Sequence, residues 1–249
     1  MIYFFNRKIG IKLLTALVTS VFIIGCNTSS FEKDQEKTGD VQMNANIEGD
    51  NLNNLQDNPV IVWLGDSLTQ GSLGDDGDNY IGAPPIILKA KYGLEIEGYG
   101  FYGNTTNDVL WRYCDETQEN QQIDPDKVYI FWLGLNDWVI DHVPNTDVQK
   151  VVDRLDNFII GGNVDKYIVM GPTKRRELRE TVNNQPMYDI INEAMKEHYG
   201  KHYMEVVDLI SLDDFGSDGI HLKKETYEKV AEEVYKRLCD DGYIKSNVK

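Results

Sequence analysis

Apolar and polar positions divide the chain from Pro59 onward into two alternating kinds of segment. Five short runs are rich in apolar, β-branched and aromatic residues, a pattern that predicts strands, most of them buried on both faces of a sheet. The predicted strands are Val60–Leu64, Leu94–Tyr99, Lys127–Leu133, Tyr167–Met170 and Met204–Asp208.

Segments with apolar residues at helical spacing separate these runs. The predicted helices are Pro84–Lys91, Thr106–Tyr113, Thr146–Phe158, Asn184–Tyr199 and Glu225–Leu238. Strands that alternate with helices form βαβ units with right-handed crossovers. The pattern therefore predicts one α/β domain over residues 59–249, a three-layer, flavodoxin-like fold with a five-stranded parallel sheet.

The first 25 residues have the pattern of a secretory signal peptide. Arg7, Lys8 and Lys12 precede an apolar run, Leu13–Gly25, that is short for a membrane span. The run ends in Ile-Ile-Gly before Cys26, which resembles the bacterial lipobox, with isoleucine in place of the usual leucine. We expect a lipidated Cys26 and an extracytoplasmic, membrane-anchored lipoprotein at the cell surface or in the periplasm. Ordinary signal cleavage and an uncleaved anchor remain alternatives.

Residues 26–58 are polar and lack apolar periodicity, so they cannot bury enough surface to order themselves. We interpret them as a flexible tether between the lipid anchor and the folded domain. Beyond Cys26 the chain has two cysteines, Cys114 and Cys239. An exported protein permits a disulfide between them, but two separate thiols fit the sequence equally well.

The chain is strongly acidic, with 41 acidic against 25 basic residues and a formal net charge of −16. Such a charge disfavours nucleic acid and anionic membranes as partners. No dinucleotide or phosphate-loop motif is present, and the Asp75–Asn79 loop lacks the spacing of a calcium-binding EF-hand. We therefore predict neither a metal nor a cofactor. We also predict that the lipid anchor is the single contact with a membrane.

Four short polar pieces follow the predicted strands: Gly65–Leu68, Gly100–Thr106, Gly134–Asp137 and Asp218–His221. The carboxyl ends of parallel strands meet at one edge of the sheet, where α/β proteins bind ligands. Together the pieces offer a serine hydroxyl, an imidazole, carboxylates and hydrogen-bond donors. Nucleophilic catalysis with an oxyanion intermediate needs these groups.

The order Gly-Asp-Ser-Leu, Gly-Asn-Thr-Thr, Gly-Leu-Asn-Asp and Asp-Gly-Ile-His resembles the SGNH (GDSL) hydrolase family, here in the form of a lipoprotein-type bacterial esterase. The match covers essentially all of Pro59–Leu238, with the motifs in the family's order. The resemblance implies an esterase or acyl hydrolase on a flavodoxin-like fold, working without a metal.

The resemblance also implies a role for each motif residue. Ser67 corresponds to the nucleophile, His221 to the general base and Asp218 to the carboxylate that orients the imidazole. The backbone N–H groups of Ser67 and Gly103 and the side-chain amide of Asn136 correspond to the oxyanion-hole donors, the amide donating through its NH₂ while a neighbour holds its carbonyl. Loss of one such donor usually costs ~10²–10³ in rate.

Two further carboxylates sit inside these motifs without an assigned chemical role. We expect Asp66 to shape the turn that exposes the serine and Asp137 to brace its own loop. Taken one by one, the motifs are also ordinary turn sequences. A folded relative that binds ligand without turning it over is a further alternative.

Substrate contacts are less well determined by the sequence. Trp111 and Trp138 lie near the motifs, and aromatic faces beside polar donors favour a sugar ester over a long acyl chain, although core packing would explain both rings. Arg175 and Arg176 belong to the one dense basic cluster, Lys174–Arg176. That cluster suits an anionic substrate or a solvated helix start paired with nearby glutamates.

We predict a serine esterase or acyl hydrolase that removes an acyl group from a carbohydrate, with a small-molecule or glycan ester as its partner. A lysophospholipase or thioesterase is the alternative within the enzyme class. The alternative from another class is a catalytically inactive surface module that binds glycans.

Overall fold

The structure is a computed structural model that describes residues 58–77, 80–115, 123–137, 148–174, 181–182 and 185–246. The predicted signal peptide, the predicted lipidation site Cys26 and the tether up to Asp57 lie outside the described residues. Their assignment therefore remains a prediction from the sequence.

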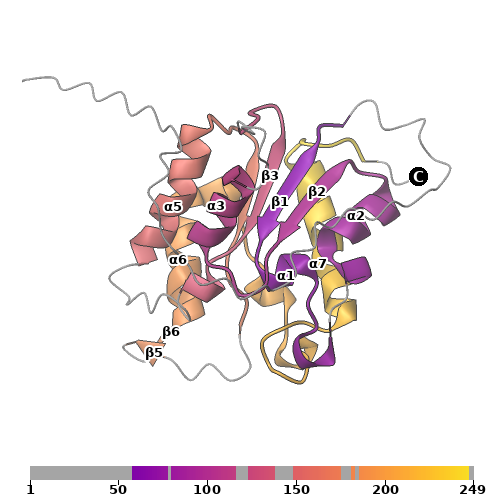
Figure 1. Cartoon of the computed structure of the whole chain (residues 1–249), viewed down its shortest axis with the longest axis vertical. Helices are drawn as coiled ribbons and strands as arrows, with labels where there is room; N and C mark the ends of the chain where they lie inside the picture. The colour runs from indigo at the N-terminus through magenta and orange to yellow at the C-terminus, as the bar shows by residue number, and fades with distance from the viewer. Residues whose placement is uncertain are drawn as a thin grey trace, which may run out of the picture. The chain divides into compact units, whose positions relative to one another are not determined.

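A five-stranded parallel sheet forms the centre of the fold, with the strand order β2-β1-β3-β4-β7 (Figure 1). The strands are β1 (Ile61–Gly65), β2 (Ile96–Gly100), β3 (Val128–Trp132), β4 (Tyr167–Met170) and β7 (Tyr203–Met204). In the register of the sheet, Gly65 lies opposite both Gly100 and Trp132. The loops after β1, β2 and β3 therefore leave the sheet at the same level.

Helices cover both faces of this sheet (Figure 1). On one face lie α2 (Pro84–Tyr92) and α7 (Lys224–Asp240), and on the other lie α3 (Thr106–Asp115), α5 (Val148–Gly161) and α6 (Met187–Tyr199). The predicted flavodoxin-like α/β fold with five parallel strands is confirmed. No helix within the described ranges is long and apolar enough to cross a membrane.

The core consists of two apolar layers separated by the sheet. Alternate strand residues such as Trp63 and Ile130 pack toward α2 and α7, while Val62 and Phe131 pack toward the other three helices. Because both faces are covered, β1 and β3 are buried along their whole length. Each fully buried aliphatic or phenylalanine side chain contributes roughly 1.5–3 kcal/mol by leaving water.

The two cysteines beyond Cys26 pack in different layers of this core. Cys239 contacts the layer with α7, and Cys114 contacts the layer with α3. The structure has no disulfide between them, as expected for residues on opposite faces of the sheet.

The last strand and the fourth predicted helix differ from the sequence prediction. Met204–Asp208 is predicted as a strand, but β7 is two residues long and Val207–Leu209 forms a 3-10 turn. The Glu205 side chain accepts a hydrogen bond from the Val207 N–H at 3.3 Å, so at this point a side chain, and not a neighbouring strand, is the partner of the backbone N–H. The helix predicted from Asn184 begins at Met187, after a short hairpin of β5 (Thr181–Val182) and β6 (Gln185–Pro186).

Candidate active site

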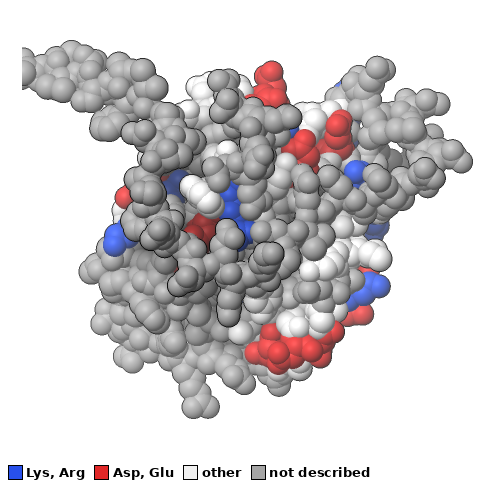
Figure 2. Space-filling view, in the orientation of Figure 1, with Lys and Arg blue, Asp and Glu red and all other residues white. Residues whose placement is uncertain are grey.

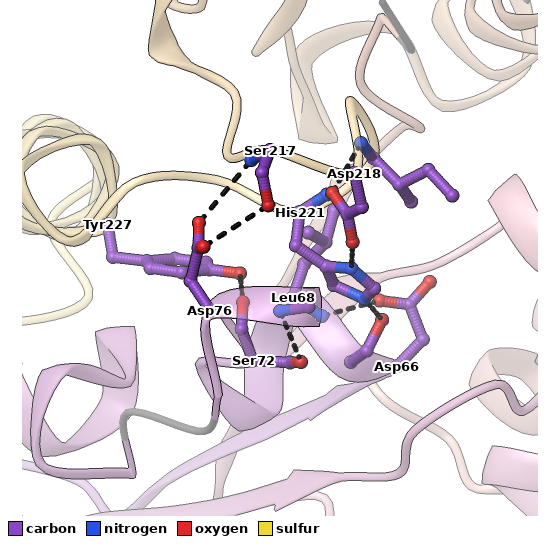
Figure 3. A network of polar contacts seen from close by, with 11 residues as sticks. Asp66, Leu68, Ser72, Asp76, Ser217, Asp218, His221 and Tyr227 are labelled. Carbon is purple, nitrogen blue, oxygen red and sulfur yellow. Dashed lines mark hydrogen bonds and ion pairs between the residues drawn. The ribbon is translucent and has the colours of Figure 1, made fainter. Parts of the chain in front are cut away.

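The end of β1 turns directly into a one-turn helix, α1 (Ser67–Gln70), which places Ser67 at the carboxyl edge of the sheet. Asp66 caps this helix, because its Oδ1 accepts a hydrogen bond from the Leu68 N–H at 2.9 Å (Figure 3). Gly71 ends the helix in a left-handed conformation. The predicted role of Asp66 in shaping the turn agrees with this geometry.

Ser67 meets His221 and Asp218 in one chain of hydrogen bonds. The Ser67 Oγ lies 2.8 Å from His221 Nε2, and His221 Nδ1 lies 2.6 Å from Asp218 Oδ2 (Figure 3). With Asp218 ionised, Nδ1 carries the ring proton and donates a hydrogen bond to the carboxylate. Nε2 is then the acceptor for the serine hydroxyl.

The loop that carries His221 holds Asp218 in its ionised form. Asp218 Oδ1 accepts hydrogen bonds from the backbone N–H groups of Ile220 at 2.8 Å and His221 at 3.0 Å. Burial alone would raise the pKa of the Asp218 carboxyl, but the bond from the His221 ring and the two backbone bonds outweigh it. The pKa of Asp218 is therefore lower than its ordinary value.

The turn Gly74–Asp76 packs directly against this loop, a contact that the sequence analysis does not predict. A Cβ on Gly74 would lie 1.8 Å from Asp218 Oδ2 and 2.8 Å from His221 Nδ1. The Asp76 carboxylate accepts hydrogen bonds from Ser217 Oγ at 3.2 Å and from the Ser217 N–H at 3.4 Å (Figure 3). The Gly74–Asp76 turn and the loop that carries Asp218 and His221 are thus joined to each other beside the Ser67–His221–Asp218 hydrogen bonds.

The loop after β2 carries Gly103, which adopts a positive φ of 70°. Phe101 anchors this loop, because its N–H donates to the Gly65 carbonyl at the end of β1 over 3.0 Å. The Asn104 N–H donates in turn to the Phe101 carbonyl at 3.2 Å. The turn that presents Gly103 is therefore tied to the same strand end that presents Ser67.

Asn136 lies between the loops after β1 and β2. Its amide nitrogen donates to the Asn104 carbonyl at 3.0 Å and to Asp66 Oδ2 at 3.4 Å. From the sequence, a neighbour is expected to hold the carbonyl of this amide, whereas in the structure neighbours hold the amide nitrogen.

Two acidic side chains are buried beside these loops. Asp137 accepts bonds from the Thr106 N–H and Oγ1, both at 2.8 Å, and from Arg154 Nη1 at 2.6 Å, which fits its expected bracing role. Burial raises the pKa of Asp137 despite these bonds. Burial also raises the pKa of Asp66 to about 7, opposed by the Leu68 N–H and assisted by the charge of Asp137.

Asp66 is expected to make the folding stability depend on pH. Its pKa in the folded state, about 7, lies above the ordinary value of 3.8, so the folded state retains a proton that the unfolded state releases between these values. Stability therefore falls as pH rises through this window. The stability of wild type relative to Asp66→Asn should decrease by roughly 3–5 kcal/mol from pH 4 to pH 7.5, measured by urea unfolding. If the free energies of unfolding of the two proteins change in parallel with pH, the raised pKa of Asp66 is contradicted.

The predicted substrate contacts are only partly described. Trp111, on α3, has 60% of its surface exposed, so the core-packing alternative is wrong for this residue. Trp138, Arg175 and Arg176 lie outside the described residues. Within the described ranges, no three His, Cys, Asp or Glu side chains gather as a possible metal site.

A serine hydroxyl bonded to an imidazole at the carboxyl edge of a parallel sheet is an arrangement typical of serine hydrolases. The chain belongs to the GDSL-like lipase/acylhydrolase family, whose sequence model matches residues 63–229. Membership of this family and the solved esterases that share its fold support an esterase or acylhydrolase activity. No curated protein matches the chain significantly.

Several solved structures share the fold at low sequence identity. A lipase/acylhydrolase from Enterococcus faecalis is 18% identical, with a TM-score of 0.53 over 74% of this chain and 96% of its own. A carbohydrate acetylesterase family member from Sinorhizobium meliloti is 19% identical, with a TM-score of 0.52 over 73% of this chain and 99% of its own. A psychrotrophic esterase from Pseudoalteromonas sp. is 18% identical, with a TM-score of 0.55 over 75% of this chain and 100% of its own.

Proposed function

We propose that the protein is a carboxylic ester hydrolase in which Ser67 is the nucleophile, His221 the general base and Asp218 the orienting carboxylate. The observation that carries this proposal is the continuous chain from Ser67 Oγ through the His221 ring to Asp218, with bonds of 2.8 and 2.6 Å. A nucleophile, a base and an orienting group within hydrogen-bond reach form the minimum unit for acyl transfer.

In the first half of the reaction, Ser67 Oγ attacks the ester carbonyl carbon while its proton passes to His221 Nε2. The tetrahedral oxyanion receives hydrogen bonds from the N–H groups of Ser67 and Gly103 and from the Asn136 amide. The intermediate then collapses, and His221 returns the proton to the departing alcohol. Water repeats these steps on the acyl-enzyme and releases the acid and the free serine.

The geometry of Asn136 suggests which hydrogen serves the oxyanion. Its bond to the Asn104 carbonyl measures 3.0 Å, whereas its contact with Asp66 Oδ2 measures 3.4 Å and is the weaker of the two. The hydrogen directed at Asp66 therefore costs less to redirect. Both hydrogens lie in one rigid amide plane, so in this proposal a small tilt of the whole Asn136 side chain brings this hydrogen to the oxyanion while the other stays within reach of the Asn104 carbonyl.

A carbohydrate ester is the substrate class we propose. His221 Nε2 protonates the departing alcohol, and the Tyr102 ring, 57% exposed, stacks on this imidazole. An exposed aromatic ring with a polar edge offers a sugar both an apolar face and a hydrogen-bonding group. The solved carbohydrate acetylesterase family member from Sinorhizobium meliloti shares the fold, which is compatible with this class.

The charge near the site favours a neutral substrate over an anionic one. Acidic side chains gather at the lower right edge of the face in Figure 2. Within the described segments that flank the histidine loop, Asp75, Asp76, Asp213 and Glu225 are exposed, against the exposed Lys223 and Lys224. The acidic residues are in excess, so the local field disfavours anionic esters.

An ester panel tests the substrate class. We expect p-nitrophenyl acetate to be hydrolysed faster than longer-chain esters, and acetate to be released from acetylated xylan or acetylated peptidoglycan fragments. A rate that stays level or rises with chain length, or turnover of lysophospholipid in preference to the glycans, would favour a lysophospholipase or thioesterase. A folded protein that hydrolyses none of these esters but binds a glycan would favour the binding module.

A further inference from the structure

The Tyr102 side chain lies against the imidazole ring of His221. The two rings are nearly parallel, with an interplanar angle of 19° and 5.3 Å between their centroids. Asp218 contacts the same imidazole at its Nδ1 edge, and Ser67 contacts it at its Nε2 edge. The face of the imidazole and its two nitrogens therefore have different protein partners.

The position of Tyr102 is fixed by the turn that presents Gly103. The Asn104 side-chain amide donates to the Tyr102 carbonyl at 3.0 Å, which closes the turn behind the ring. On the preceding residue, the Arg112 guanidinium carbon lies 5.1 Å from the centroid of the Phe101 ring. These contacts hold the backbone that carries Tyr102, and the stack on His221 is present in the structure without any substrate.

We propose that Tyr102 is a positioning residue that stabilises the positively charged form of His221 through the face of its ring. The inference rests on the proposed function, because the charge on His221 affects turnover at the step in which this residue takes the serine proton. A cation within about 6 Å of an aromatic centroid is attracted by the negative face of the ring. Asp218 stabilises the same charge from the edge, so the two effects act from different directions.

Among the described residues, the other groups near the imidazole act on its edges or on its loop and not on the face of its ring. Asp218 is the carboxylate bonded to the ring, and Gly74 brings only backbone against Nδ1. Asp76 reaches the histidine loop through Ser217 rather than through the ring itself. Within the described residues, Tyr102 is the aromatic ring that stacks on the His221 imidazole.

Two substitutions distinguish the effect of the Tyr102 ring from the effect of its hydroxyl. Tyr102→Leu removes the aromatic face and should move the acid limb of the kcat/KM profile to lower pH by about 0.4–0.7 pH units, because an exposed cation–π contact has that strength. At the pH optimum, kcat should fall about 2- to 5-fold. Tyr102→Phe keeps the face and should leave the acid limb within about 0.1 pH units of wild type.

A second tyrosine–histidine stack provides a matched control. Tyr167, at the amino end of β4, stacks on His202 with 4.2 Å between ring centroids. This pair lies at the opposite end of the strand from the candidate active site. Tyr167→Leu should therefore leave the acid limb unchanged.

An NMR titration of the His221 ring resonances in Ser67→Ala gives a readout that does not need activity. The resonances are assigned by their disappearance in His221→Asn. Adding Tyr102→Leu should lower the titration midpoint by the same amount as in the kinetic profile. An unmoved midpoint in a folded double variant would overturn the inference, and so would Tyr102→Phe behaving like Tyr102→Leu. If the wild type hydrolyses no ester, the proposed function fails, whereas the NMR result still decides whether the ring stabilises the charged histidine.

Discussion

Ser67→Ala is expected to lower kcat for p-nitrophenyl acetate by roughly 10⁶-fold and to abolish labelling by a fluorophosphonate probe. The hydroxyl that His221 Nε2 contacts at 2.8 Å is the nucleophile in the proposed reaction, and alanine has no atom to replace it. A fluorophosphonate is a suitable probe because its phosphorus reacts covalently with an activated serine hydroxyl.

Ser211→Ala is a suitable control for this experiment. Ser211 has an exposed hydroxyl bonded to Asp214, outside the hydrogen-bonded chain of the site, and its loss should leave both labelling and turnover in place. Circular dichroism would establish that Ser67→Ala is folded. Labelling that persists in folded Ser67→Ala would place the reactive nucleophile elsewhere.

Gly74→Ala is expected to lower kcat by about 10³–10⁴-fold while the protein stays folded. The added methyl group would lie 1.8 Å from Asp218 Oδ2 and 2.8 Å from His221 Nδ1, so either these side chains or the Gly74 turn must shift, and we expect the Asp218–His221 bond to be disturbed. Removal of the orienting carboxylate in serine hydrolases costs about 10⁴ in kcat, which sets the upper limit of the effect. The measurement is kcat and KM on one ester, with KM expected to change far less than kcat.

Gly77→Ala separates this collision from backbone strain. Gly77 also has a positive φ, of 102°, but a Cβ there would meet no atom within 4 Å. Gly77→Ala should therefore lose stability without a comparable loss of kcat.

Gly74→Ala combined with Asp218→Asn should be no slower than the slower single variant, because both changes act on one carboxylate. Additive losses, or a Gly74→Ala enzyme with the wild-type kcat, would contradict the argument.

The sequence was sufficient to predict the sheet because the strands that form its centre are apolar throughout. β1 and β3 are buried on both faces, and each lies within two residues of its predicted bounds. The motif order also predicted that Ser67 and His221 would lie at one edge, and the structure brings them into hydrogen-bond contact. Local patterns thus carry the fold and the position of the site.

Contacts between loops leave no comparable pattern in the amino-acid sequence. The approach of Gly74 to Asp218 depends on how two loops far apart in sequence pack together, and the neighbouring residues give no periodic signal for it. The stack of Tyr102 on His221 is a long-range contact of the same kind. The end of β7 was missed for a local reason, because the Val207 N–H bonds to the Glu205 side chain, a contact that the apolar pattern of Met204–Asp208 does not indicate.

The hydrogen bond between Ser67 and His221 joins residues that are 154 positions apart. The serine lies just after the first strand, whereas the histidine comes shortly before α7, the last helix of the fold. A chain that is still being synthesised, or is held unfolded, therefore has its serine without its base. In the proposed reaction, activation of the hydroxyl thus requires the docking of the carboxyl-terminal segment, so the recovery of fluorophosphonate labelling during refolding would report when that segment has docked.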